Sequence, residues 1–306
     1  MAWRAYQIVF KARSPVHVGW HTLGYIKLTR PYITGRAMWG AMTANKARSN
    51  PNNHNFPDYE GIGDLFRSDI ITSYFYPALD PQKPMLPKFT DEGIKIGEYN
   101  RNEFEKIFIR SFGQTGIGPV TNTAEEETLH ESEFISPIVE SDSKEEKQQV
   151  YFTGYLFLND KAEYNKEKIK WENLVPALSE LYVGGDRKYG WGRLSLDHTL
   201  TKEVKDKKFF GHDIDLKNEK LNVTIQKGKP IPAHLAIAST VALDLSGDVE
   251  PLVGREWGRV IGYDKKENIG FGRKISKATL CWVPGSIVEK DMMFSINEFG
   301  LLNAVE

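Results

Sequence analysis

Residues 183 to 194, VGGDRKYGWGRL, combine the residue types that bind a charged single-stranded polymer. Their four glycines permit turns through positive φ and let another backbone come close. Between them stand three cations that can neutralise phosphates and two rings that can stack on unpaired bases: Arg187, Lys188, Arg193, Tyr189 and Trp191. The stretch predicts an RNA-binding loop, although packing of both rings into the core of an ordinary hairpin also fits it.

A second group of candidate RNA-binding residues lies near the N-terminus: His17, His21, Arg30, Thr34 and Arg36. In the segment YITGRAM, Thr34 can cap a helix whose free backbone N–H groups and positive dipole end lie beside Arg36. Such a helix start suits a phosphate. Arg36 and Arg193 also fit ordinary surface charges, and His17 fits a plain strand residue.

A third group repeats the glycine pattern of the first. YGWGRL and IGFGRK share the order glycine, aromatic, glycine, arginine, which argues for two related halves. The second copy lies in a segment rich in glycine and arginine, from which three residues are further candidates for RNA binding: Arg255, Arg259 and Arg273.

The charge distribution points to the same kind of partner. Although the net charge is only −1, residues 1 to 50 carry +8 without any acid, and residues 254 to 277 carry +4. Residues 121 to 147 carry −7. Such asymmetry is typical of a nucleic-acid surface, and solvated charged faces produce it as well.

The elements that must position these residues alternate between strand and helix. AYQIVFKA predicts a strand, PYITGRAMWGAMTANKARS a helix, QVYFTGYLFLN a strand and WENLVPALSEL a helix, so a β-α-β-β-α-β unit closes near residue 200. Residues 49 to 64 are read as a loop. The charged stretch 201 to 216 is the expected junction between a domain at 1–200, with an acidic insertion near 121–147, and a smaller one at 201–306.

Four segments together resemble the repeat-associated mysterious proteins, or RAMPs, of CRISPR effector complexes. They are SPVHVGWHTLGYIKLTRPYITGRAMWGAM, NTAEEETLHESEFI, GGDRKYGWGRL and GFGRKISKATLCWVPGSIV, and they follow the order of that family over most of the chain. The resemblance implies an α+β fold of two ferredoxin-like, RRM-like β-α-β-β-α-β domains with long insertions. It also implies that the glycine-rich loop and the turn before the first helix touch the guide RNA.

The function that the resemblance implies is a guide-RNA (crRNA) binding subunit of a type III CRISPR ribonucleoprotein effector complex, acting in antiviral defence. Two glycine-loop halves fit the two-domain subunit that caps the 5′-tag end and docks on the large polymerase-type subunit. Backbone RAMP subunits are then its other neighbours, and target RNA is reached only indirectly. A backbone RAMP subunit that binds without slicing is an alternative.

RNA cleavage is the main point on which this chain departs from RAMPs that slice. Those subunits carry an aspartate shortly before the proline-containing turn, whereas the matching segment YIKLTRPYITG has no Asp or Glu that could bind a metal. We therefore expect no catalytic residue. Another RAMP branch matures guide RNA without metal, often through a histidine, so an endoribonuclease that uses His17 or His21 is the second alternative.

Other chemistries lack sequence support, so we expect neither a cofactor nor a metal. No GxxxxGK[ST] phosphate loop occurs, and Gly19 and Gly24 argue against a helix that would pair His17 with His21 as ligands. The single cysteine, Cys281, excludes a disulfide framework and fits a reducing cytoplasm. The apolar runs are shorter than the ~20 residues that span a bilayer, so we expect no membrane association.

Overall fold

The structure is a computed structural model that describes residues 2–49, 57–140, 147–237, 243–261 and 267–305. Strands dominate, and four α-helices occur among the described residues: α1 (Gly35–Ser49), α2 (Tyr59–Ser68), α3 (Arg101–Phe108) and α4 (Trp171–Leu178). The predicted α+β class is therefore confirmed.

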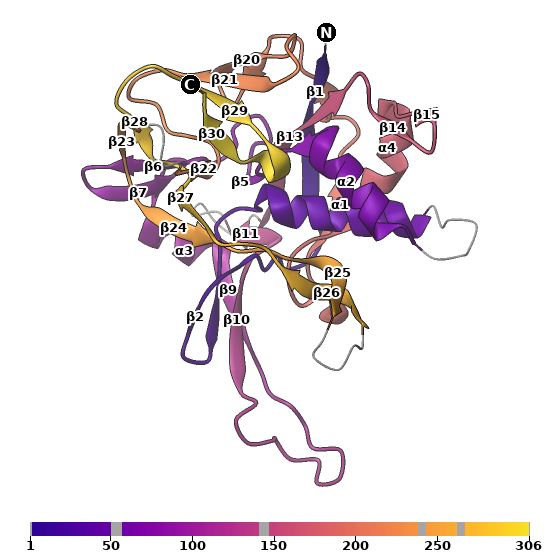
Figure 1. Cartoon of the computed structure of the whole chain (residues 1–306). Helices are drawn as coiled ribbons and strands as arrows, with labels where there is room; N and C mark the ends of the chain where they lie inside the picture. The colour runs from indigo at the N-terminus through magenta and orange to yellow at the C-terminus, as the bar shows by residue number, and fades with distance from the viewer. Residues whose placement is uncertain (1, 50–56, 141–146, 238–242, 262–266, 306) are drawn as a thin grey trace.

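The first half of the chain forms a seven-stranded sheet, the first sheet (Figure 1). Its strands are β1 (Trp3–Ala12), β4 (Ile70–Thr72), β5 (Tyr76–Ala78), β13 (Tyr151–Asn159), β16 (Glu180–Tyr182), β17 (Arg193–Leu196) and β18 (Lys202–Glu203). The neighbours β17, β1, β13 and β4 are all antiparallel, and α1 and α4 connect them along the chain. This is the β-α-β-β-α-β connection that the sequence predicts to close near residue 200.

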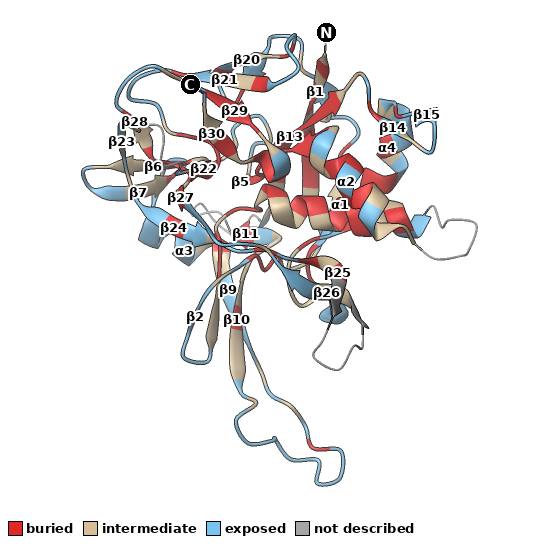
Figure 2. Ribbon diagram, viewed as in Figure 1, coloured by how far each residue is buried: buried red, intermediate tan, exposed pale blue. Residues whose placement is uncertain are grey.

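Both faces of the first sheet are buried (Figure 2). Because successive strand residues point to opposite faces, Ile8 and Phe10 of β1 enter one core with α1 and α4, while Trp3 and Ala5 enter another. The near-continuous apolar sequence of β13 has the same cause, since its alternate residues serve both cores. The face opposite the helices is thus not open to a ligand.

The second half of the chain covers that face with an eight-stranded sheet. Its order is β19 (Lys208–Phe209), β20 (His212–Asp215), β21 (Leu221–Ile225), β29 (Met292–Ile296), β30 (Leu302–Ala304), β22 (Leu235–Ala236), β27 (Thr279–Trp282) and β24 (Val249–Leu252). Residues such as Val223 and Phe294 meet Trp3 and Phe157 in the shared core. The predicted boundary at residue 200 lies just before β18, which still pairs with β1 in the first sheet, and the eight-stranded sheet begins at β19. One of the two cores is built from both sheets.

The described residues from 201 to 305 contain strands and one 3-10 turn, η2 (Glu298–Gly300), but no α-helix. The expectation of a second β-α-β-β-α-β unit is therefore wrong for this part of the chain. Its apolar residues alternate with a period of two, as at Leu221, Val223 and Ile225, which suits a strand. Prolines and glycines interrupt the intervening stretches and leave little room for a helix.

The hairpin of β9 (Ile109–Gln114) and β10 (His130–Ile135) extends from the body of the protein as an arm (Figure 1). It belongs to a four-stranded sheet completed by β2 (Gly19–Leu23) and β3 (Ile26–Thr29). The predicted acidic insertion near 121–147 overlaps this arm. Its described part forms the tip of the arm, β10, β11 (Ile138–Glu140) and the start of β12 (Lys147–Gln149).

The remaining elements are short. They are β6 (Pro87–Thr90), β7 (Gly93–Ile96), β8 (Tyr99–Asn100), β14 (Glu163–Tyr164), β15 (Glu167–Lys168), β23 (Leu245–Ser246), β28 (Ile287–Val288), the 3-10 turn η1 (Arg187–Tyr189), and the hairpin of β25 (Arg255–Ile261) and β26 (Glu267–Ile275). The sequence analysis missed α2, which begins at residue 59 inside the expected loop. Asp58 caps it by accepting a hydrogen bond from Gly61 N (2.8 Å).

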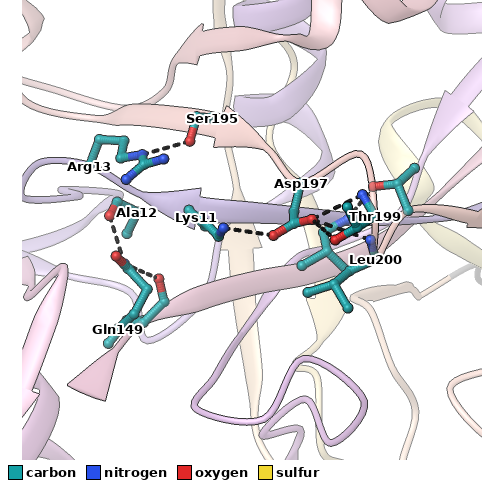
Figure 3. Close-up of polar contacts among 11 residues, drawn as sticks. Lys11, Ala12, Arg13, Gln149, Ser195, Asp197, Thr199 and Leu200 are labelled. Atoms are coloured by element: carbon teal, nitrogen blue, oxygen red, sulfur yellow. Dashed lines mark hydrogen bonds and ion pairs between the residues drawn. The ribbon is translucent and has the colours of Figure 1, made fainter.

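A polar cluster fixes β17 beside β1 (Figure 3). The Asp197 carboxylate contacts Lys11 Nζ at 2.9 Å and accepts hydrogen bonds from the Thr199 hydroxyl and backbone N–H. Desolvation opposes its ionisation, but the bonds from Thr199 and Lys11 outweigh this and lower the pKa of Asp197 to about 2. Arg13 donates to the Ser195 hydroxyl nearby. The cluster holds the strand that follows the glycine-rich loop.

Candidate nucleic-acid interface

A cavity of about 890 Å³, the central cavity, lies where three distant parts of the chain meet. Its walls come from α1 and α2, from the glycine-rich loop 183–192, and from the β25–β26 hairpin. Five of the residues that the sequence analysis proposed for RNA binding or catalysis line it: His17, Thr34, Arg36, Arg187 and Arg255. The structure thus brings at least one member of each predicted group together at one site.

The glycine-rich loop is held by the chain segment that precedes β2. Gly185 N donates to His17 O (2.9 Å), and Gly192 N donates to Pro15 O (2.6 Å). Gly192 has φ +78°, and a Cβ there would lie 1.9 Å from Val183 O. A side chain is therefore excluded at this position by backbone contact as well as by conformation. The loop is a rigid wall of the central cavity.

The two rings of the loop have different surroundings. Tyr189 is 70% exposed and offers a free face for stacking. Trp191 is only 8% exposed and packs against Phe134, with ring centroids 4.9 Å apart. Of the two predicted stacking residues, Trp191 therefore packs in the protein interior. This is the position expected for both rings if the stretch were an ordinary hairpin.

The cations of the loop also differ. Lys188 is exposed, and Arg193 is exposed but paired with Glu180 at 2.7 Å. The Arg187 side chain is exposed as a whole, yet desolvation, together with the nearby Arg48, lowers the pKa of its guanidinium. Arg187 and Arg48 are therefore like charges held near each other, which favours an anion between them.

The start of α1 has the predicted geometry. Thr34 Oγ1 accepts a hydrogen bond from Ala37 N (3.3 Å), and Met38 N donates to Thr34 O (3.1 Å), so Thr34 caps the helix. Arg36, in the first turn, lies over the Phe299 ring at 3.9 Å and forms an ion pair with Glu256. The second half of the chain thus supplies both contacts of Arg36.

The β25–β26 hairpin forms the opposite wall. Arg255 and Arg273 are exposed on it, and Arg255 lines the central cavity. Arg259 lies in β25, but its side chain falls outside the described residues. Lys274 also lines the cavity and was not singled out, although it directly follows Arg273 in the second glycine pattern.

The two candidate histidines are not brought together. His17 is buried in the wall of the central cavity, and its Nδ1 lies 2.6 Å from the carbonyl oxygen of Glu133. Since a carbonyl only accepts, Nδ1 carries the proton and Nε2 is left as the acceptor of the neutral ring. His21 is exposed, lies against Trp20, and lines a second cavity of about 590 Å³.

Arg30 is buried in an ion-pair network beside this second cavity. Its Nη1 donates to Glu250 Oε1 (2.5 Å), which also contacts His234 Nε2 at 2.5 Å. Desolvation of Glu250 is outweighed by these bonds from His234 and Arg30, which lower its pKa to about 2. The charge of Arg30 is thus compensated inside the protein by Glu250. This buried position differs from the RNA-facing surface that the sequence predicted for Arg30.

Several residues of the site escaped the sequence analysis, notably Arg67, Glu256, Tyr59 and Trp257, which all line the central cavity. The rings of Tyr59 and Trp257 contact each other at a tilt of 43°, with centroids 4.8 Å apart. Tyr59 and Arg67 lie on α2, and the amphipathic sequence of this segment could have predicted the helix. No local pattern links them to residues almost 200 positions later.

Among the described residues, no group of three or more His, Cys, Asp or Glu side chains is arranged to hold a metal ion. None of the described helices combines the length and apolar character needed to cross a bilayer.

Comparison with known proteins shows a similarity in fold. A chain of the Type III-B Cmr-beta complex bound to cognate target RNA and AMPPnP, solved by cryo-EM, superposes with a TM-score of 0.53 at 10% identity, over 93% of this chain and 86% of that chain. A chain of the same complex bound to cognate target RNA gives a TM-score of 0.50 at 12% identity, over 92% and 86%. No family model matches the sequence, and no curated protein matches it.

Proposed function

We propose that this chain is a guide-RNA binding subunit of a type III CRISPR effector complex, and that it binds RNA without cutting it. The observation that carries the proposal is the central cavity, in which the glycine-rich loop, the start of α1 and the second basic hairpin converge. Five cations line it, against three carboxylates: Arg36, Arg67, Arg187, Arg255 and Lys274, against Glu60, Asp64 and Glu256. This balance suits a phosphate backbone.

The buried faces of the first sheet support the same location. RRM-type domains commonly stack bases on the open face of their sheet, but the second half of the chain covers that face here. The central cavity and the exposed ring of Tyr189 then remain as the basic, partly aromatic surface. We further propose that the first sheet with α1 and α4 is a ferredoxin-like RAMP domain.

The finer assignment is the cap that holds the 5′ tag of the guide and docks on the large polymerase-type subunit, with backbone RAMP subunits as neighbours. Two basic, glycine-rich segments that line one cavity support it, the loop through Gly185 and Arg187 and the β25–β26 hairpin through Lys274, because a short tag can contact both. A photo-crosslinker in place of Tyr189, in the complex purified with its native partners, tests this assignment. Crosslinks within the tag support the cap, whereas crosslinks along the guide would favour a backbone subunit.

A binding titration tests the RNA contact itself. Replacing Arg187, Lys188 and Arg193 by Ala should weaken binding of single-stranded repeat-derived RNA at least tenfold and make the slope of log affinity against log salt shallower by about 2. The matched control replaces three exposed lysines that line neither cavity: Lys168, Lys217 and Lys220. Equal effects in the two variants, with both folds intact, would remove the loop from the interface.

One observation favours the endoribonuclease alternative. The bond from Nδ1 to the Glu133 carbonyl leaves Nε2 of His17 as the basic atom of a ring in the cavity wall. We nevertheless propose no cleavage, because the other candidate histidine, His21, lines the second cavity and does not lie beside His17 as a partner in acid–base catalysis. Incubation of the chain with repeat RNA in the presence of a chelator is the test. Cutting that disappears in His17→Ala would establish the endoribonuclease.

A further inference from the structure

One carboxylate stands among the cations of the central cavity in a place where a phosphate would be expected. Glu256, on β25, is 6% exposed and accepts hydrogen bonds from Arg36 Nη1 and from Arg67 Nη2 (3.4 Å). A carboxylate held by two guanidinium groups has the geometry of a phosphate oxygen pair held by the same groups. The two arginines come from α1 and α2, and the carboxylate from the opposite wall.

The two guanidinium groups are positioned by aromatic rings, independently of Glu256. Arg36 lies over Phe299 at 3.9 Å, and Arg67 lies 5.3 Å from the Trp39 ring and 5.4 Å from the Phe299 ring. Both rings are buried. Because cation–π contacts hold the arginines on the core side, their positive charges stay in place if the carboxylate leaves.

Arg67 has spare capacity for a ligand. Its buried Nε has no hydrogen-bond partner among the described residues, and its remaining contact is an ion pair with Glu298 at 3.6 Å. A buried N–H without an acceptor is costly, and an arriving phosphate oxygen can satisfy it. The pair of arginines is therefore better matched to a ligand with several oxygens than to the Glu256 carboxylate and the more distant Glu298.

We propose that Arg36 and Arg67 form a phosphate-binding site, and that Glu256 occupies it in the RNA-free protein and is displaced by an RNA phosphate. The ligand class rests on the proposed RNA-binding function. Displacement raises the positive charge that faces the RNA by one unit at the moment of binding. It also removes a link between the β25–β26 hairpin and the body, so the hairpin reports whether the cavity is filled.

The hairpin is attached in a way that permits this response. At its base Gly254 N donates to the Ser276 hydroxyl (2.7 Å), and Ser276 N donates to Gly254 O (2.9 Å). Beyond the base, the tilted ring contact of Tyr59 with Trp257 and the ion pairs of Glu256 join it to α1 and α2. Loss of the ion pairs therefore removes part of the support of the hairpin, so that its strand pairing opens more often.

The test compares Glu256→Gln with Glu105→Gln, which removes an exposed arginine-paired carboxylate on α3 (Arg101 Nε at 2.8 Å). We expect Glu256→Gln to bind repeat-derived RNA at least fivefold more tightly than wild type, and Glu105→Gln to bind it equally. Backbone amides of residues 255–261 and 267–275 should exchange hydrogen faster in Glu256→Gln without RNA. If Glu256 only stabilises the fold, RNA affinity falls or stays equal, which would overturn the proposal.

Two further measurements keep the proposal testable if Glu256→Gln folds poorly. In the wild type, inorganic pyrophosphate, compared with chloride at equal ionic strength, should speed exchange in the same amides. Arg67→Ala should abolish that response. A response to pyrophosphate without RNA binding would sink the proposed function alone, whereas RNA binding with an unchanged hairpin would sink this inference alone.

Discussion

The glycine pattern occurs twice, as YGWGRL at 189–194 and IGFGRK at 269–274, and the two copies adopt different conformations. Gly272 and Lys274 of the second copy line the central cavity, whereas near the first copy the lining comes from Gly184, Gly185 and Arg187, which precede it. The second glycine of each copy is left-handed, Gly192 with φ +78° and Gly272 with φ +71°. The first copy runs from a loop, in which Gly192 N donates to Pro15 O, into the start of β17, whereas the second lies within β26 and pairs with β25. The pattern therefore predicts where the backbone turns, while the neighbouring segment decides whether it becomes loop or strand.

The largest expected effect comes from a side chain at the second glycine of the loop. Gly192→Ala places Cβ against Val183 O and should lower the free energy of unfolding by more than about 3 kcal/mol. Gly190→Ala has a similar positive φ but no atom within 4 Å, and Gly272→Ala meets only the Arg255 side chain near 4 Å. Each of these should cost about 1–2 kcal/mol. Denaturant unfolding of the three variants is the measurement, and equal losses would contradict the packed-loop geometry.

The next effect separates the two rings of the loop. Trp191→Ala should destabilise the protein by about 3–5 kcal/mol, because it empties the site against Phe134. Tyr189→Ala should leave stability unchanged and weaken RNA binding by about 1–3 kcal/mol, because its exposed ring is free to stack on a base. Melting curves and RNA titrations of both variants are compared. A Tyr189→Ala variant with wild-type RNA affinity would leave the loop without a stacking residue.

A smaller effect concerns the anchoring of the loop strand. The pKa of Asp197 is lowered to about 2 when folded, against about 3.9 when unfolded, so its contribution of about 2 kcal/mol is present above pH 4 and is lost as the pH falls toward 2. Asp197→Asn should remove this part of the acid sensitivity. Unfolding free energies of both proteins between pH 2 and 7 are the measurement. If the unfolding free energies of the two proteins fall in parallel as the pH is lowered, Asp197 does not contribute to the acid sensitivity.

Local sequence signals predicted the parts of the fold that depend on neighbours in the chain. The Thr34 cap, the strand pattern of β1 and the glycine-rich loop each lie within about fifteen residues. The sequence could not show that Arg30 would be neutralised by Glu250, which is 220 positions away, or that Arg36 would meet Glu256. Nor could it distinguish the exposed Tyr189 from the buried Trp191, because the side of the hairpin that meets Phe134 is set by tertiary packing.

The shared core has a consequence for synthesis on the ribosome. When residue 200 has been added, the first sheet still lacks the strands that cover Trp3, Tyr155 and Phe157, because these come from residues 209 to 302. Translation adds roughly 5–20 residues per second, so this aromatic face stays exposed to water for about 5–20 s in each nascent chain. We expect the half-made protein to need a chaperone during that interval, and fragments that end near residue 200 to aggregate.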